Sequence, residues 1–125
     1  MENILQIKNL SIVYTESQIA VHDLSMDIPK GSIVAIVGES GSGKSTALRS
    51  FVRLLSGEGR IASGEILFHD EDLTKMSQKK LRQIRGRRIS MIFQDAAASL
   101  DPRKKIGYQY VEVLRSHFHI SKEEA

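Results

Sequence analysis

The sequence predicts an α/β fold in which the strands of a mixed sheet alternate with helices. Residues 33–37 form a continuous apolar run, which is typical of a strand buried on both faces of a sheet. Residues 45–55 place apolar side chains at helical spacing. Between the two, residues 38–45 read Gly-Glu-Ser-Gly-Ser-Gly-Lys-Ser and match every fixed position of the pattern G-x-x-x-x-G-K-[S/T]. A strand, this loop and a helix, in that order, predict a site for nucleotide phosphates.

The composition of the loop suits a triphosphate. Backbone N–H groups and the positive end of a helix dipole hold phosphate oxygens, and glycine permits the tight, partly left-handed backbone that this requires. We expect the Lys44 ammonium at the β- and γ-phosphates and the Ser45 hydroxyl on Mg²⁺. The residues expected to bind the nucleotide here are Gly38, Glu39, Ser40, Gly41, Ser42, Gly43, Lys44, Ser45 and Thr46. The fold class is therefore predicted as a P-loop NTPase that uses ATP or GTP.

Further strands are predicted on both sides of the loop. Residues 4–14 and 19–28 alternate in hydrophobicity, so we expect them to pair as a hairpin. Residues 64–68 are expected to form another strand, and the apolar run at residues 89–93 a second core strand. Together these predict an antiparallel β-subdomain at the amino-terminal end and a core sheet beside it.

Two more helices are predicted towards the carboxyl-terminal end. One spans residues 77–85, capped by Ser77 and ended by Gly86, and the other follows the apolar stripe at residues 106–118. Residues 121–124 read Ser-Lys-Glu-Glu, a capping box that would open a further helix. Because the sequence ends one residue later, we expect a truncated domain.

Composition bounds the class of protein. The chain has 125 residues, 41% hydrophobic and 26% charged, which fits one globular domain or less. Its apolar runs are far shorter than the roughly 20 residues of a membrane span, and its first residues do not resemble a leader, so a cytosolic location is expected. Six basic residues lie within residues 79–88, but no aromatic residue interleaves them to stack bases. We therefore expect a solvated helix face there and no nucleic-acid partner.

Several segments resemble, in order and spacing, the first half of an ATP-binding-cassette (ABC) nucleotide-binding domain of the peptide/nickel importer group. They are Glu39-Ser40 within the loop and residues 64–68, 81–86, 91–95 and 99–102. The resemblance covers essentially the whole chain. It implies ATP and Mg²⁺ as ligands, a β-subdomain and P-loop core over residues 1–93, a glutamine loop over 94–105 and the start of a helical subdomain over 106–125.

The resemblance also implies roles for two residues outside the loop. Gln94 would contact Mg²⁺ and the attacking water, and so would share the catalytic role with Lys44, while its loop would contact membrane subunits. Tyr14 would stack on adenine, giving weak selectivity for ATP over GTP; the alternative is an ordinary tyrosine at a strand end. Ala96 departs from the group, which usually has proline there, so the coupling loop is less constrained.

The family's hydrolytic machinery also needs a signature segment, a strand ending in aspartate and glutamate, and a switch histidine, and the sequence matches none of them. Residues 55–59 and 66–71 resemble the first two superficially but lie at the wrong places. Hydrolysis by this chain alone is therefore expected to be very slow. His117 and His119 are two residues apart on a predicted helix and face different sides, which argues against a metal site.

Three functions stay open on the sequence. The leading one is the energy-coupling subunit of an importer, which would pair with a second nucleotide-binding domain, with permease subunits on the inner face of the membrane and, indirectly, with a substrate-binding protein. The second is a P-loop kinase acting on a small molecule, because the loop alone does not choose between the two. The third is a remnant that binds ATP without turnover. The cargo cannot be read from these residues.

Overall fold

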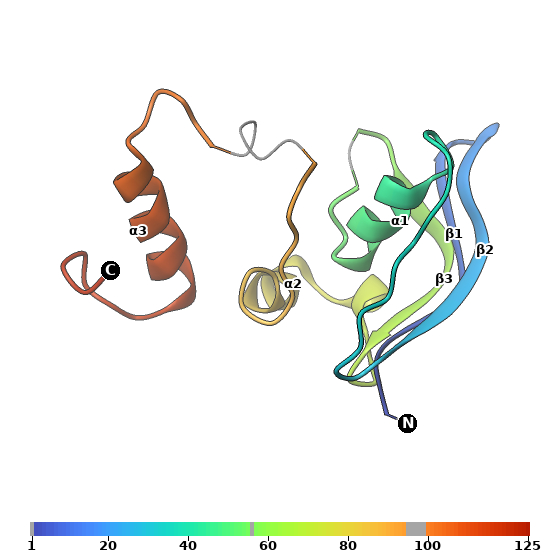
Figure 1. Cartoon of the computed structure of the whole chain (residues 1–125), viewed down its shortest axis with the longest axis horizontal. Helices are drawn as coiled ribbons and strands as arrows, with labels where there is room; N and C mark the ends of the chain where they lie inside the picture. Colours follow the sequence, from blue (N-terminus) through green and yellow to red (C-terminus); the bar gives the residue numbers. More distant parts are fainter. Residues whose placement is uncertain (1, 56, 95–99) are drawn as a thin grey trace. The chain divides into compact units, whose positions relative to one another are not determined.

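The structure is a computed structural model that describes residues 2–55, 57–94 and 100–125. It divides into two compact units, residues 1–77 and residues 78–125. The elements of the first unit are β1 (Asn3–Thr15), β2 (Gln18–Pro29), α1 (Lys44–Phe51), β3 (Arg60–Phe68), β4 (Glu71–Asp72) and a 3-10 turn η1 (Leu73–Lys75). Those of the second are α2 (Gln78–Ile84) and α3 (Ile106–His117) (Figure 1).

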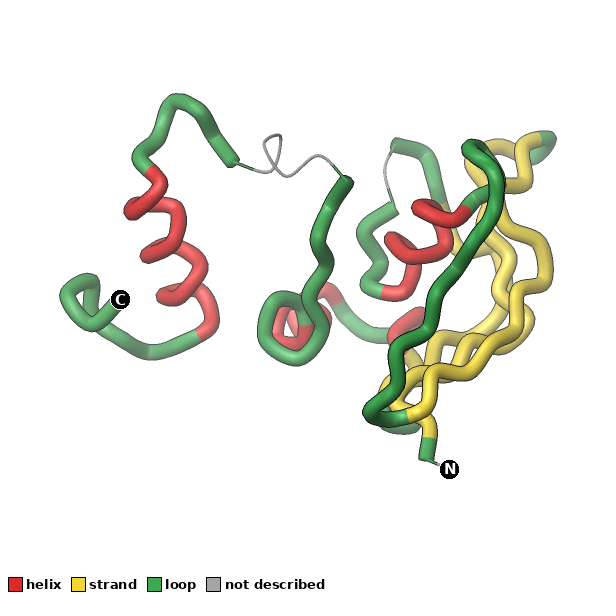
Figure 2. The backbone as a smooth tube through the Cα atoms, in the orientation of Figure 1, coloured by secondary structure: helices red, strands yellow, loops and turns green. Residues whose placement is uncertain are grey.

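The first unit is built on an antiparallel sheet, whose strands are yellow in Figure 2, and its strand order is β2-β1-β3-β4. The predicted hairpin is confirmed: β1 and β2 pair from Asn3 opposite Pro29 to Thr15 opposite Gln18. Irregularities bend this ladder near Asn9, whose side-chain amide donates to Asp23 Oδ1 at 2.9 Å, and both residues have positive φ. Their short polar side chains tolerate that conformation and hydrogen-bond each other, so they stabilise the bend.

The predicted strand at residues 64–68 is confirmed and extends backwards to Arg60. Gly64 has φ +98°, and a Cβ added there would lie 2.5 Å from the carbonyl oxygen of Asn9 and 2.5 Å from Leu10 Cα. The two backbones thus cross too closely for any side chain. Gly64 lets β3 pass the irregular stretch of β1.

The core of the first unit lies where the sheet meets α1 and η1. Ile7, Leu10 and Ile12 of β1 are buried, together with Ile66 of β3 and Leu73 of η1. Figure 1 shows α1 against one face of this sheet, where it contributes buried Ala47, Ser50 and Phe51. The first unit therefore has an apolar centre of its own.

Helix α1 ends earlier than predicted, at Phe51 rather than Leu55. The Arg53 N–H bonds the Ser50 carbonyl at 2.9 Å and the Leu54 N–H bonds the Arg49 carbonyl at 2.8 Å, which is a Schellman cap. Arg53 occupies the left-handed position of this cap, with φ +55°. Its guanidinium donates to the carbonyls of Met76 at 2.6 Å and Leu73 at 3.4 Å. These bonds help to hold an arginine where glycine is usual, so the end predicted from helical spacing was too late.

The two strands predicted at residues 33–37 and 89–93 are not formed. The prediction of a mixed core sheet was wrong for these two segments. Ile33 is 99% exposed and Ile92 is 92% exposed, and neither segment joins a ladder within the described residues. A central parallel strand is stable only with a hydrogen-bonded neighbour on each side and with both faces covered. The described part of the chain supplies neither neighbour, so the apolar runs stay extended.

The second unit contains the two predicted carboxyl-terminal helices. The prediction of a helix at residues 106–118 is confirmed by α3, and that at residues 77–85 by α2, whose Leu81 and Ile84 are buried. Gly86, with φ +78°, ends this turn as predicted, and a Cβ there would lie 2.7 Å from His117 Nε2 at the end of α3. The Ser121 hydroxyl accepts from the Glu124 N–H at 3.2 Å, which is half of the predicted capping box.

The start of α3 is tied to the segment before it by Gln109. Its side-chain oxygen accepts from the Asp101 N–H at 2.9 Å, and its amide nitrogen donates to the carbonyls of Asp101 at 3.0 Å and Lys104 at 3.1 Å. The Arg103 side chain and N–H both bond the Asp101 carboxylate and hold its pKa below the ordinary value.

None of the helices in the described residues has the length and apolar character that crossing a bilayer would require.

Candidate functional site

The candidate site is the glycine loop, residues 38–45, at the amino-terminal end of α1. Gly41 and Gly43 have φ +82° and +93°, so two of its glycines adopt the left-handed backbone that the sequence predicted. Gly43 also caps α1, and a Cβ there would lie 2.6 Å from the Ala20 carbonyl oxygen of β2. β2 therefore limits this position to glycine, a constraint that the loop pattern alone did not reveal.

The first half of the loop makes a tight turn. The Ser42 N–H donates to the Glu39 carbonyl at 3.1 Å. A Cβ at Gly38 would lie 2.8 Å from the Ser42 hydroxyl oxygen, so the missing side chain leaves room for the Ser42 side chain. The turn brings the start of the loop back beside its end, close to the first residues of α1.

Lys44 lies back across this turn. Its ammonium donates to the Glu39 carbonyl at 2.8 Å and also to the Gly38 carbonyl. Both acceptors are backbone carbonyls of the loop, so the loop itself binds the Lys44 ammonium. The expected Lys44 role is compatible with this position, because a flexible four-carbon stem can move the charge over several ångströms.

The amino-terminal end of α1 carries no negative side chain. Its first turn contains no acidic residue, and Gly43 provides no side-chain cap. The positive end of the helix dipole is therefore not neutralised by α1's own side chains, which favours an anion there. Ser45 is exposed in this first turn, where a hard oxygen ligand would be open to a cation.

Tyr14 lies next to this turn. It stands near the end of β1, half-buried, and its hydroxyl is 3.4 Å from Thr46 Oγ1. The phenol thus touches α1 directly, a contact that sequence reasoning missed. Stacking of this ring on adenine stays a prediction, but the contact brings Tyr14 and Thr46 of the predicted set together.

A cavity of about 360 Å³ separates β2 from the glycine loop. On the β2 side it is lined by Ala20, Val21 and Met26, and on the loop side by Gly38 and Lys44, among others. The loop therefore rests on β2 at Gly43 while leaving space behind its other residues. The hairpin prediction alone could not show that β2 contacts the loop at Gly43, because the position of β2 relative to the loop was not known from the sequence.

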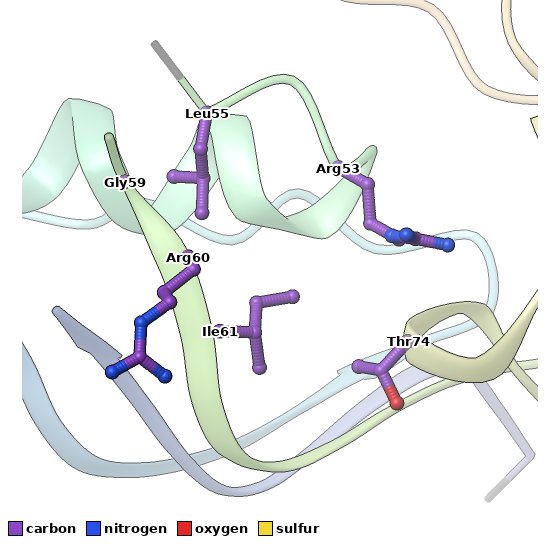
Figure 3. Close-up of a pocket in the computed structure, with 6 residues that line it drawn as sticks. All are labelled: Arg53, Leu55, Gly59, Arg60, Ile61 and Thr74. Carbon is purple, nitrogen blue, oxygen red and sulfur yellow. The ribbon is translucent and has the colours of Figure 1, made fainter. Parts of the chain in front are cut away.

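A second hollow, of about 310 Å³, lies at the other end of α1 (Figure 3). Arg53 and Thr74 line one side of it, while the Arg60 guanidinium points away from both. Because Arg53 donates to backbone carbonyls of residues 73 and 76, its charge serves the fold. This hollow does not include any residue of the glycine loop.

The predicted partner of Ser45 in binding Mg²⁺ lies in the other unit. Gln94 is exposed and belongs to residues 78–125, so the magnesium pair stays a prediction. An exposed serine hydroxyl and an exposed amide oxygen are ligands that Mg²⁺ accepts beside phosphate oxygens. Ala96, the departure in the coupling loop, lies outside the described residues.

Comparison with known proteins identifies the family. The family model described as "ABC transporter" matches residues 21–124. The chain belongs to the ABC transporter family. It is 42% identical over 98% of its length to the oligopeptide transport ATP-binding protein OppD of Bacillus subtilis, and 41% identical over 93% to the dipeptide transport ATP-binding protein DppD of Lactococcus lactis. These matches favour the transporter prediction over the kinase alternative.

Solved ABC structures share its fold. The chain superposes on cbiO1 of Clostridium perfringens, part of the cbiONQ transporter complex, with a TM-score of 0.71 and 29% identity over 99% of this chain and 46% of that one. A bacterial Atm1-family exporter with ATP bound gives 0.62 and 30% over 89% of this chain and 18% of that one. The ABC-type P-loop fold class is thus confirmed. The chain covers 35% and 34% of the OppD and DppD sequences, about a third of these curated relatives.

Proposed function

We propose that this ABC chain is the nucleotide-binding part of the ATP-binding subunit of an importer for peptides. The observation that carries the proposal is the glycine loop, with its lysine, at the unneutralised amino-terminal end of α1. The names of the relatives, which are transport proteins for oligopeptides and dipeptides, support peptides as cargo over nickel.

Each residue of the site has a proposed task. The loop amides and the α1 dipole hold the phosphates of ATP, Lys44 carries positive charge to the β- and γ-phosphates, and Tyr14 covers the base. Ser45 and Gln94 are the residues that would hold Mg²⁺. The ion, when bound, neutralises charge on the phosphate oxygens. The remaining residues proposed to contact ATP are Gly38, Glu39, Ser40, Gly41, Ser42, Gly43 and Thr46.

Hydrolysis by these residues alone is proposed to be very slow. The sequence provides no match to the family's signature segment, its aspartate–glutamate strand or its switch histidine, so no carboxylate is available to orient the water. We propose that the working unit pairs with a second nucleotide-binding domain and with permease subunits at the cytoplasmic face of the membrane. A substrate-binding protein would deliver the cargo to the permease.

The test is calorimetric titration of the purified chain with Mg-ATP. We expect saturable binding that Lys44→Ala abolishes and that Lys30→Ala leaves unchanged. Lys30 is a matched control because it is an exposed lysine in a turn after β2, outside the loop. Equal binding by all three proteins, or by none, would contradict the assignment of the site to this loop.

Turnover is measured on the same samples as phosphate release. Binding with negligible release is expected for the chain alone. Release that is fast and disappears in Lys44→Ala would overturn the proposal that the missing carboxylates limit hydrolysis.

A further inference from the structure

Basic residues are concentrated in one short stretch around the start of the second unit. Residues 73–94 contain seven lysines and arginines and no acidic residue. Across the chain, residues 1–77 hold seven basic and ten acidic side chains, whereas residues 78–125 hold eleven basic and five acidic ones. The modest net charge of +3 is therefore the sum of a net negative charge on the first unit and a net positive charge on the second.

Among the exposed basic residues of this stretch, two lie three residues apart on α2 and another lies in the turn that follows α2. On α2 the apolar residues Leu81 and Ile84 are buried, at 1% and 5% exposure. Lys79 and Arg82 are exposed and three residues apart, so they are neighbours on a helix. Arg87, in the turn that follows, is exposed as well. These three residues, Lys79, Arg82 and Arg87, are called the basic face below.

Backbone bonds fix the turn to the helix. The Arg87 N–H donates to the Ile84 carbonyl at 3.3 Å, and the Arg88 N–H donates to the same oxygen at 2.8 Å. The Arg87 guanidinium lies 5.4 Å from the centre of the Phe118 ring, which limits its directions. The basic face is thus carried by a short, internally bonded piece of chain and not by a flexible tail.

We propose that the basic face binds the headgroups of anionic phospholipids. The three charges complement a surface of dense negative charge, and each Lys or Arg close to such a surface contributes measurably to binding. Single-stranded nucleic acid is disfavoured, because residues 73–92 contain no aromatic ring on which a base could stack, and the Phe118 ring near Arg87 is already faced by that guanidinium. The inference goes beyond the proposed function but uses it in one step, since a transporter subunit works beside a membrane.

The experiment uses the whole chain, without nucleotide, and extruded vesicles of phosphatidylglycerol and phosphatidylcholine. Sedimentation with increasing lipid gives a partition coefficient. We expect binding to mixed vesicles that weakens as salt rises, and little binding to pure phosphatidylcholine. Replacing the basic face (Lys79→Gln/Arg82→Gln/Arg87→Gln) should reduce the partition coefficient about a hundredfold, at about fivefold for each charge.

A matched variant removes the same charge from exposed positions of the first unit, Lys8→Gln/Lys30→Gln/Arg60→Gln. It should bind vesicles within a few fold of the parent chain. The double variant Lys79→Gln/Arg82→Gln keeps the Arg87–Phe118 contact and should still lose about 25-fold. This second variant keeps the test valid if loss of Arg87 disturbs the second unit.

Three results would overturn the proposal. One is equal binding to neutral vesicles, which would indicate apolar adsorption. Another is equal loss in the matched variant, which would indicate a net-charge effect. The third is tighter binding of a single-stranded RNA oligomer, lost with the basic face. ATP titration of the same variants separates this inference from the proposed function, because either can fail while the other holds.

Discussion

Residues 1–77 bury a continuous apolar core, whereas among the described residues of 78–125 the large apolar side chains buried are only Leu81 and Ile84. The first unit has a sheet with long-range ladders and an excess of acidic residues. The second has two helices, an excess of basic residues and an α3 without a buried residue. A substitution should therefore act cooperatively in the first unit and locally in the second.

The largest effect is expected at Gly64. Replacing it with alanine forces a Cβ to within 2.5 Å of the β1 backbone at a φ that side chains rarely adopt. We expect Gly64→Ala to lower the free energy of unfolding of the first unit by about 3 kcal/mol or more, measured by urea denaturation.

Gly57→Ala is the matched control for Gly64→Ala. Gly57 has φ +61°, but a Cβ there would meet no atom within 4 Å. It should cost only about 1 kcal/mol of backbone strain. Equal losses in the two variants would mean that the close crossing of β1 and β3 is not what makes Gly64 sensitive.

The next effect is expected at Arg53, where two substitutions separate backbone strain from hydrogen bonding. Arg53→Ala removes the bonds to the Met76 and Leu73 carbonyls but keeps a side chain at φ +55°, and should cost about 2 kcal/mol. Arg53→Gly removes the same bonds but relieves the left-handed position, and should cost about 1 kcal/mol. Urea denaturation gives both values. A glycine variant less stable than the alanine variant would rule out this account of the α1 end.

In the second unit we expect Gln109→Met to act only near the start of α3. The change removes the acceptor of the Asp101 N–H and two donated bonds. Hydrogen exchange at the Asp101 N–H should become about tenfold faster, because one to two kcal/mol of local protection is lost. Gln83→Met, at an exposed position of α2, is the control and should leave that amide unchanged. Faster exchange in the first unit's ladder amides would contradict the separation of the units.

The smallest effect concerns the pH dependence of Asp101. Its pKa is lowered mainly by the side-chain bond from Arg103, so this bond stabilises the folded state above the ordinary aspartate pKa. That stabilisation is lost as pH falls through the lowered value. A carboxyl titration followed by NMR should show a midpoint that Arg103→Gln raises towards the ordinary range. Arg115→Gln, at an exposed α3 position, should not move it; an unchanged midpoint in both would remove Arg103 as the cause.

The sequence predicted those elements whose stabilising contacts are local or directly readable. Alternation identified the hairpin, and helical spacing identified α3 within one residue of its end. It failed at residues 33–37 and 89–93, because a parallel strand depends on neighbours that periodicity does not reveal. It also placed the end of α1 too late, since nothing about an arginine predicts a left-handed cap held by carbonyls of residues 73 and 76.

The candidate site was predictable in composition but not in contacts. The loop pattern identified its residues and the need for glycine. It could not show that β2 approaches Gly43 through the Ala20 carbonyl, nor that the Tyr14 hydroxyl meets Thr46. These contacts join segments far apart in the sequence, and they depend on the register and twist of the sheet.

The Lys44 ammonium donates hydrogen bonds to the Gly38 and Glu39 carbonyls. These carbonyls therefore compete with a bound anion for the ammonium. An anion that recruits this ammonium must displace both carbonyls. The observed Kd is then the intrinsic Kd divided by the fraction of molecules in which the ammonium is released. A triphosphate can offset that loss through many contacts, whereas a single small anion cannot. The loop's own backbone would thereby act as a filter for ligand size.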